Sequence, residues 1–132
     1  MVKAFYTALI ALLIVVGASY FEQRYIKNTF EELTSIASVV QEKTEDKTAV
    51  KDDVLSLQDF WIEKKRTLHV FIPHNDIKEV DLWISEAVTL VENKMWEDAL
   101  SKLEVVIEKA EQIPKTYLLR VENILCNSIP NF

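Results

Sequence analysis

The hydrophobic pattern divides this chain into one unbroken apolar stretch and a series of amphipathic segments. From Ala4 to Phe21, eighteen consecutive residues carry no charge. A helix of about eighteen to twenty apolar residues is long enough to cross a hydrocarbon core of about 30 Å. We therefore expect contact with a membrane through residues 4–21. The pattern divides the chain into an N-terminal segment, residues 1–21, and a second domain, residues 22–132.

Two fates of the apolar stretch are open: an uncleaved transmembrane anchor, or a signal peptide cut near Val16-Gly17-Ala18. The length of the stretch favours the anchor, as do Tyr20 and Phe21, which lie where an interfacial aromatic belt would. Basic residues are nearly balanced, with Lys3 and the amino group on one side and Arg24 and Lys27 on the other. The short amino tail favours an amino end inside the cell and a domain outside it.

Beyond Phe21, apolar residues recur at alternating spacings of three and four, which is typical of helices that bury one face. The polar sequence QEKTEDK at residues 41–47 predicts a turn, with Asp46 or Thr48 as the following N-cap. The helices expected from this pattern cover about residues 22–43, 48–71, 77–92, 95–113 and 117–125. The fold class is therefore all-α: an N-terminal transmembrane helix followed by a small antiparallel bundle of four to five helices.

Prolines and polar residues set the expected helix boundaries in the second half of the chain. Pro73 and Pro114 each predict the end of a helix, because proline lacks a backbone N–H and disfavours a helical residue before it. Asn75 or Asp76 then caps the third helix of the domain, and Thr116 caps the last short one. Asn93-Lys94 is a turn short enough to make its two flanking helices antiparallel.

Composition limits the possible functions of residues 22–132. This part holds fourteen basic and twenty-one acidic residues, a net charge of −7 that disfavours binding to nucleic acid phosphates. A single cysteine, Cys126, excludes an internal disulfide. Gly17 is the only glycine, so glycine-rich phosphate loops and nucleophile elbows are not expected.

The residues that bear reactive groups do not form a recognisable catalytic pattern. His69 and His74 are five residues apart with Pro73 between them, a spacing that does not place them on one helical face. A metal-dependent protein centred on His74, with Asp76 and Glu79 as further ligands, is the weakest of the alternatives. We expect no enzymatic activity, no metal and no cofactor.

Tryptophans and one basic cluster are the candidates for contact with a partner. Trp61 and Trp96 fall on inward faces by periodicity and are expected in the core, whereas Trp83 lies one position away from the apolar stripe. A partly exposed tryptophan is a good anchor for a partner protein. The basic cluster Lys64-Lys65-Arg66 is a second candidate, against the plainer interpretation of a solvated helix face.

Several features of the sequence resemble one known family. They are Trp61 in a helix rich in Lys and Glu, His74 at the break before an acidic helix start, the Ala99 to Leu103 hairpin, and Ile113-Pro114 followed by Asn123-Ile124-Leu125. The chain resembles the uncharacterised bacterial proteins grouped as domain of unknown function 4363, and Pro73 before His74 departs from that pattern. The resemblance implies a short helical protein that begins with a membrane span, and it supplies no activity or catalytic residue.

We therefore expect a single-pass membrane protein with its domain outside the cytoplasm. Its expected role is that of an accessory or interaction subunit, whose partner is another membrane or envelope protein in the same bilayer, because an anchor raises the effective concentration of such a partner. The alternative is a secreted helical binding module, released by cleavage near Gly17.

Overall fold

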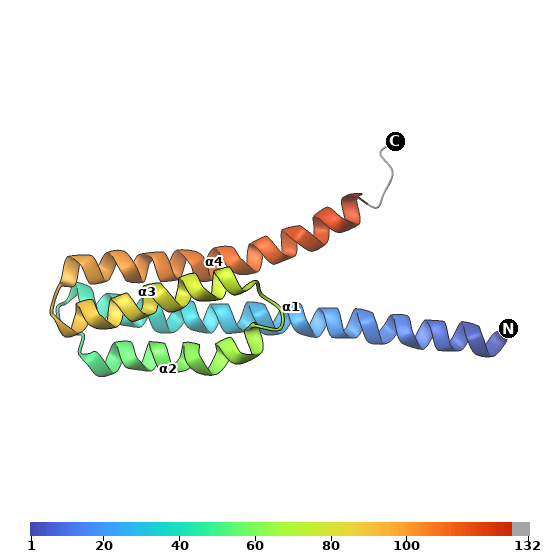
Figure 1. Cartoon of the computed structure of the whole chain (residues 1–132), viewed down its shortest axis with the longest axis horizontal. Coiled ribbons are helices and arrows are strands. Elements are labelled where there is room, and N and C mark those ends of the chain that lie inside the picture. The colour runs from blue at the N-terminus through green and yellow to red at the C-terminus, as the bar shows by residue number, and fades with distance from the viewer. Residues whose placement is uncertain (128–132) are drawn as a thin grey trace.

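The computed structural model describes the backbone of residues 1–127 and the side chains of residues 1–117. In this part the chain forms four helices and no strand: α1 (Val2–Glu45), α2 (Lys51–Leu68), α3 (His74–Glu92) and α4 (Trp96–Asn127). The all-α prediction is confirmed (Figure 1). The expected bundle of four to five helices beyond the apolar segment has four members in the described residues, because α1 is at once the apolar arm and the first helix of the bundle.

Helix α1 runs without interruption from the apolar stretch into the bundle. Every residue from Met1 to Phe21 is exposed, and no residue before Ile26 is buried. From Ile26 onward, buried side chains recur along one face of the helix, at Phe30, Leu33, Ala37 and Val40. The apolar part of α1 has the length and composition of a membrane span, and a signal sequence would have them too.

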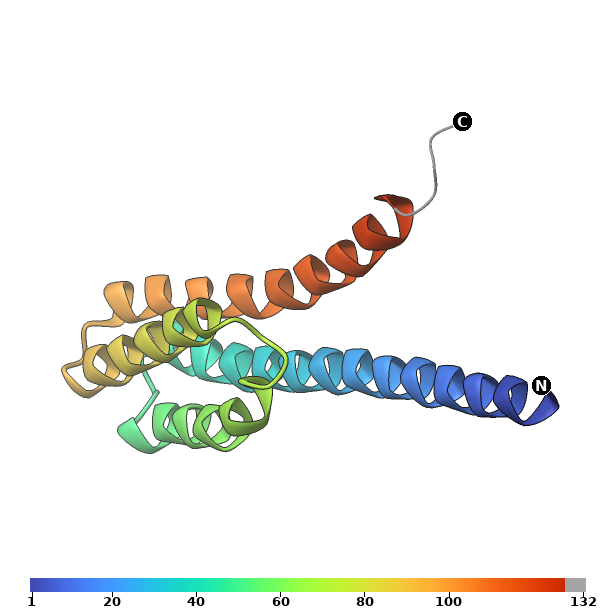
Figure 2. The same cartoon turned by 45° about the vertical axis from the view of Figure 1, so that its right-hand side comes forward.

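The four helices pack as an up-and-down bundle. Each helix contacts its neighbours in chain order, and α4 closes the ring by packing against α1 (Figure 1). Consecutive helices are antiparallel, so α2 and α4 both run back toward the end of the bundle from which the apolar arm leaves (Figure 2). The turn between α2 and α3 therefore lies at the arm end, and the other two turns lie at the far end (Figure 1).

The core is made from the apolar stripes of all four helices. Its largest fully buried side chains include Trp61, which is 1% exposed, and Phe30, whose ring centroid is 6.2 Å from that of Trp61. The prediction that Trp61 lies in the core is therefore confirmed. Trp96 packs against the core but is only half-buried. The other large side chains that are fully buried are Leu33, Val54, Leu57, Leu68, Ile77, Val80, Ile84, Leu103 and Val106.

Both turns at the far end are built without glycine. Lys47 and Lys94 adopt positive φ angles of 56° and 57°, in the left-handed region where glycine is usual. At each turn the lysine N–H and the following N–H bond back to helix carbonyls, Lys94 to Val91 and Met95 to Leu90 in the second turn. This pair of bonds is a Schellman motif, which satisfies the last carbonyls of the helix.

The start of α2 differs from the sequence prediction. The helix runs over Lys51–Leu68 rather than residues 48–71, and its N-cap is Val50 rather than Asp46 or Thr48. The Asp53 carboxylate accepts a hydrogen bond of 2.9 Å from the Val50 N–H, and it also accepts one of 2.7 Å from Lys43 Nζ. A side chain three residues inside the helix therefore binds the N–H of the N-cap residue, which is the reciprocal contact of a capping box, and the side chain of Val50 itself caps no N–H.

The prediction that Pro114 ends a helix is wrong, since α4 continues through it to Asn127. Thr116, expected as the cap of a separate helix, instead donates a hydrogen bond to the Gln112 carbonyl inside α4. Proline removes one helical hydrogen bond and bends a helix without always ending it. The last part of α4 turns away from α1 in both views (Figures 1 and 2).

The start of α3 also differs from the prediction. This helix begins at His74, with Pro73 as its N-cap, instead of at Ile77 after an Asn75 or Asp76 cap. Pro73 thus precedes the first turn of a helix, where its missing N–H costs nothing because that N–H would have no partner.

Candidate functional site

The bend of α4 opens a cleft between α1 and α4 at the arm end of the bundle. The cleft has a volume of about 550 Å³. Its described lining comes from nine residues of α1 between Ser19 and Glu31, together with Pro114 and Tyr117 of α4. The cleft therefore lies where the apolar arm joins the bundle, and Tyr20 belongs to both.

Charges of both signs line this cleft on α1. Arg24 and Lys27 are opposed by Glu22 and Glu31, and all four residues lie within three turns of the same helix. Their mutual contacts are weak: Lys27 Nζ is 4.0 Å from Glu31, and Arg24 donates to the Tyr20 hydroxyl at 3.4 Å. Exposed pairs of this kind contribute little to stability, so these groups can exchange their contacts for those of a ligand at small cost.

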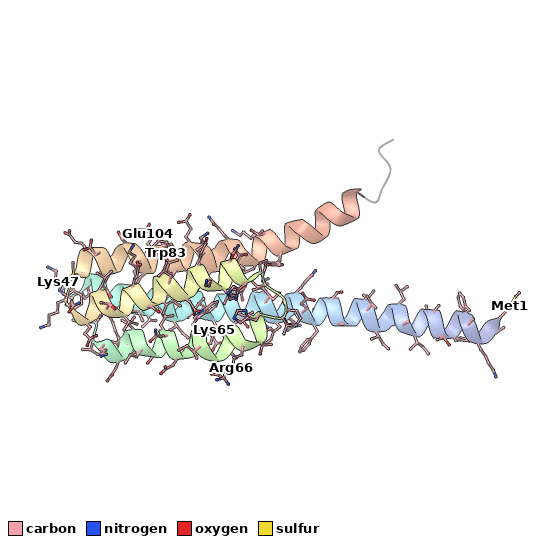
Figure 3. All side chains as sticks on the ribbon, in the orientation of Figure 1. Met1, Lys47, Lys65, Arg66, Trp83 and Glu104 are labelled. Carbon is pink, nitrogen blue, oxygen red and sulfur yellow. The ribbon has the colours of Figure 1, made fainter. Side chains whose placement is uncertain are left out.

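Trp83, predicted as a partner contact, is half-buried on α3 and faces α4. The Lys102 ammonium lies 4.5 Å from the centre of a Trp83 ring, and the same Nζ is 3.1 Å from the Glu86 carboxylate. Figure 3 shows Trp83 beside α4, on the opposite side of the bundle from Arg66. One part of the indole therefore remains available for contact, while Lys102 holds its orientation.

The basic residues Lys64, Lys65 and Arg66 do not act as a single cluster in the structure. Lys65 forms an ion pair of 2.9 Å with Asp81 of α3, and the Lys64 ammonium lies 5.8 Å from the Phe60 ring centre. Arg66 is exposed and points away from the bundle (Figure 3). The predicted contact residues thus lie on two separate surfaces, with Trp83 on one and Arg66 on the other.

Asp81 is an important residue that the sequence analysis did not single out. Its carboxylate accepts a hydrogen bond of 2.6 Å from the Trp61 indole N–H and another of 2.9 Å from Lys65 Nζ. It therefore satisfies the polar atom of a buried tryptophan and also links α2 to α3. The spacing of Trp61 and Lys65, one helical turn apart, was the available signal for a shared acidic partner.

His69 and His74 lie together, although they do not share one helical face: His69 is the C-cap of α2 and His74 is the first residue of α3. Their rings are stacked, with centroids 5.4 Å apart and an interplanar angle of 26°. The turn between α2 and α3 folds the chain back and brings the two rings together. Among the described side chains, no group of three or more His, Cys, Asp or Glu residues converges as metal ligands would.

The turns at the two ends of the bundle differ in charge. The sequence of the arm-end turn, residues 67–75, holds no Asp, Glu, Lys or Arg, and Val70 within it is 75% exposed. At the far end, eight of the twelve residues from Glu42 to Asp53 are charged. An uncharged turn with an exposed valine suits the boundary of a membrane, and a charged turn suits water.

The fold and these surfaces define a class of protein, an acidic four-helix bundle whose first helix extends as a long apolar arm. The sequence model of the family described as Domain of unknown function (DUF4363) matches residues 20–124, and the chain belongs to this family. The resemblance drawn from Trp61, His74 and the Ile113-Pro114 region is thereby confirmed. No curated protein and no solved structure matches the chain.

Proposed function

We propose that the protein is a single-pass membrane protein with an extracytoplasmic bundle, and that it acts as an accessory or interaction subunit for another membrane protein. The observation that carries this proposal is the continuous helix α1, whose eighteen uncharged residues are all exposed, whereas from Ile26 onward the same helix buries one face. Leaving so much apolar surface in water costs about 25 cal/mol per Å², so a lipid environment is strongly favoured.

The difference in charge between the turns at the two ends supports an arrangement in which the arm end of the bundle lies nearest the bilayer. The arm-end turn has no fixed charge, and Tyr20 and Phe21 are exposed at the junction where an aromatic belt is usual. The charged turns are then directed away from the bilayer. A rigid α1 holds the bundle at a fixed height and angle above the membrane, which suits contact with a neighbouring protein.

The partner surface that we propose is the α3–α4 side of the bundle around Trp83. Leu82, next to Trp83, is 54% exposed, and a shallow pocket lined by Ser85, Leu90 and Lys102 continues along this side. Aromatic anchors beside apolar and polar groups are typical of the centre of protein interfaces. Arg66, on the opposite side, is the competing candidate and becomes the control.

The topology is tested first in intact cells. Cys126 is replaced by Ser, a single cysteine is placed at Asp46 in the far-end turn, and a membrane-impermeant maleimide is applied. We expect labelling without permeabilisation, at full length, in the membrane fraction. Labelling only after lysis would place the bundle in the cytoplasm. A shorter, soluble product would instead establish a secreted helical binding module.

The partner is tested with a photo-crosslinking amino acid at Trp83, and with the same probe at Arg66 in a second variant. We expect a crosslink to one membrane protein from position 83 and none from position 66. The reverse pattern would move the interface to α2. Equal, diffuse crosslinking from both positions would contradict a specific partner surface.

A further inference from the structure

The last part of α4 begins level with the end of the apolar arm that joins the bundle. Helix α4 is antiparallel to α1, and Pro114 and Tyr117 line the cleft together with α1 residues that begin at Ser19. Ten further residues of helix follow Tyr117, and they extend about 15 Å at a rise of about 1.5 Å per residue. This segment therefore reaches the depth of the bilayer if α1 crosses the bilayer.

Beyond Tyr117, the backbone of α4 does not follow the arm. Every residue from Met1 to Phe21 is exposed, and the described side chains of α4 that reach this stretch are Pro114 and Tyr117, at the cleft beside Ser19 and Tyr20. Both views show the end of α4 diverging from α1 (Figures 1 and 2). The backbone of this helix end therefore lies apart from the arm.

The sequence of the segment is amphipathic. Apolar residues occupy positions 117, 118, 121, 124 and 125, a spacing that places them on one helical face. Ile113 and Ala110, one and two turns earlier, belong to the buried stripe of α4, and this apolar face continues the same stripe. The apolar stripe of α4 thus continues past the last residue that the core of the bundle buries, Ile113.

Charge and length favour the membrane interface over a second span. The segment from Tyr117 to Asn127 has eleven residues, about half the number that a transmembrane helix needs, and it includes Arg120 and Glu122. With Lys115, residues 115–127 carry a net charge of +1, although the whole of residues 22–132 carries −7. A short amphipathic helix with basic residues is typical of segments that lie in the headgroup layer.

We propose that residues 118–127 are a second membrane contact, an amphipathic segment that runs from the end of the bundle into the headgroup layer of the bilayer that α1 crosses. This inference rests on the proposed anchoring through α1. The bend at Pro114 directs the segment away from α1 and into the lipid. The bundle is then held at two points, by α1 and by the end of α4, which fixes its rotation about the α1 axis as well as its height.

The test uses the full chain, with Cys126 replaced by Ser, in vesicles of phosphatidylcholine and phosphatidylglycerol. Single cysteines carry a nitroxide label at Ile124 on the apolar face, at the neighbouring Asn123 on the polar face, and at Leu12 in the arm. Collision with a water-soluble nickel complex, present on both sides of the vesicles, is compared with collision with oxygen. We expect nickel accessibility at Ile124 to be at least about threefold lower than at Asn123, with oxygen accessibility higher.

Two results would overturn the inference. One is equal nickel accessibility at Ile124 and Asn123, which would place the segment in water. The other is low accessibility of Ile124 to both nickel and oxygen, which would indicate burial against protein. The label at Leu12 separates this inference from the anchoring, because a water-accessible Leu12 would refute the anchor itself. A lipid-exposed Leu12 beside a water-exposed Ile124 would refute only the second contact.

Discussion

At the scale of single residues, Asp81 joins the core to the surface. Its carboxylate receives the indole N–H of Trp61, a side chain that is 1% exposed. In Asp81→Ala, the buried N–H loses its acceptor, and an unsatisfied buried donor costs about 1–3 kcal/mol. We therefore expect the free energy of unfolding of Asp81→Ala to fall by about 2 kcal/mol, measured by guanidinium unfolding of the full chain in a mild detergent.

Two further variants separate the hydrogen bond between Asp81 and Trp61 from the ion pair between Asp81 and Lys65. Asp81→Asn keeps an oxygen acceptor and should lose less than half as much stability. Lys65→Ala removes only the half-exposed ion pair, which is expected to contribute less than about 1 kcal/mol. If Lys65→Ala and Asp81→Ala were equally destabilising, the ion pair rather than the Trp61 hydrogen bond would explain the effect.

Asp53 gives the stability of the bundle a dependence on acid pH. The hydrogen bond from Lys43, with that from the Val50 N–H, holds the pKa of Asp53 below its ordinary value of 3.8. The folded chain therefore binds this proton less tightly than the unfolded chain does. The stabilisation is complete above the unfolded pKa and is lost as the pH falls through the lowered folded pKa.

The measurement for Asp53 compares the wild-type chain with Asp53→Asn in unfolding experiments at several pH values. We expect the wild type to be more stable by about 1 kcal/mol at pH 7, because both a capping contact and a half-exposed ion pair depend on the charge. The difference should shrink as the pH falls below about 4, the ordinary range for an aspartate. A difference that is constant down to pH 2 would contradict the role of the ionised carboxylate.

The sequence predicted the burial of apolar side chains better than the contacts of polar side chains. The burial of Trp61, Val80, Ile84 and Ala99 follows from helical periodicity, and the structure confirms it. The contacts of Asp81, Asp53 and the two histidines depend on which helices are neighbours and on how the chain turns between them. Periodicity along one helix carries no such information, so these polar contacts were not predicted.

At the scale of elements, Pro114 decides the shape of α4. Proline at this position deprives the Ala110 carbonyl of its helical hydrogen bond and favours a bend. In Pro114→Ala, the new N–H can bond to that carbonyl, and the helix should straighten toward α1. We expect the distance between spin labels at Ser19 and Asn123 to shorten by about 5 Å, as straightening a bend of about 20° over nine residues would produce.

The control for Pro114 is Lys115→Ala, the next position along α4, which is exposed and already has a backbone N–H. This variant should leave the label distance unchanged. An unchanged distance in Pro114→Ala would mean that packing against α1, rather than the proline, directs the end of α4.

Pro73 and Pro114 together show where the rule that a proline ends a helix holds and where it fails. Pro73 does separate two helices, as predicted, because residues 69–73 form a turn between α2 and α3. Pro114 does not, because the packed stripe of α4 continues across it, from Ile113 to the partly buried Tyr117. The packing of that stripe against α1 outweighs one missing hydrogen bond, and a rule based on neighbouring residues does not include this energy.

At the scale of the whole molecule, the two ends of the bundle face different surroundings under the proposed anchoring. Val70 and Val50 form a natural pair for testing this, since they flank α2 at opposite ends and are both exposed, at 75% and 57%. Val70 follows α2 in the uncharged arm-end turn, and Val50 precedes α2 among charged residues. Helix α2 has eighteen residues and separates the two positions by about 27 Å at a rise of about 1.5 Å per residue.

A nitroxide label at Val70 should therefore be less accessible to a water-soluble nickel complex than a label at Val50, in the full chain reconstituted in vesicles. We expect a reduction of about twofold or more, because the headgroup layer excludes the complex only in part, whereas the far end projects beyond it. The same pair in detergent micelles controls for local burial. Equal accessibility of the two labels in vesicles, with Leu12 shielded by lipid, would mean that the arm is inserted but the bundle stands clear of the bilayer. In that case, α1 alone would set the height of any partner surface.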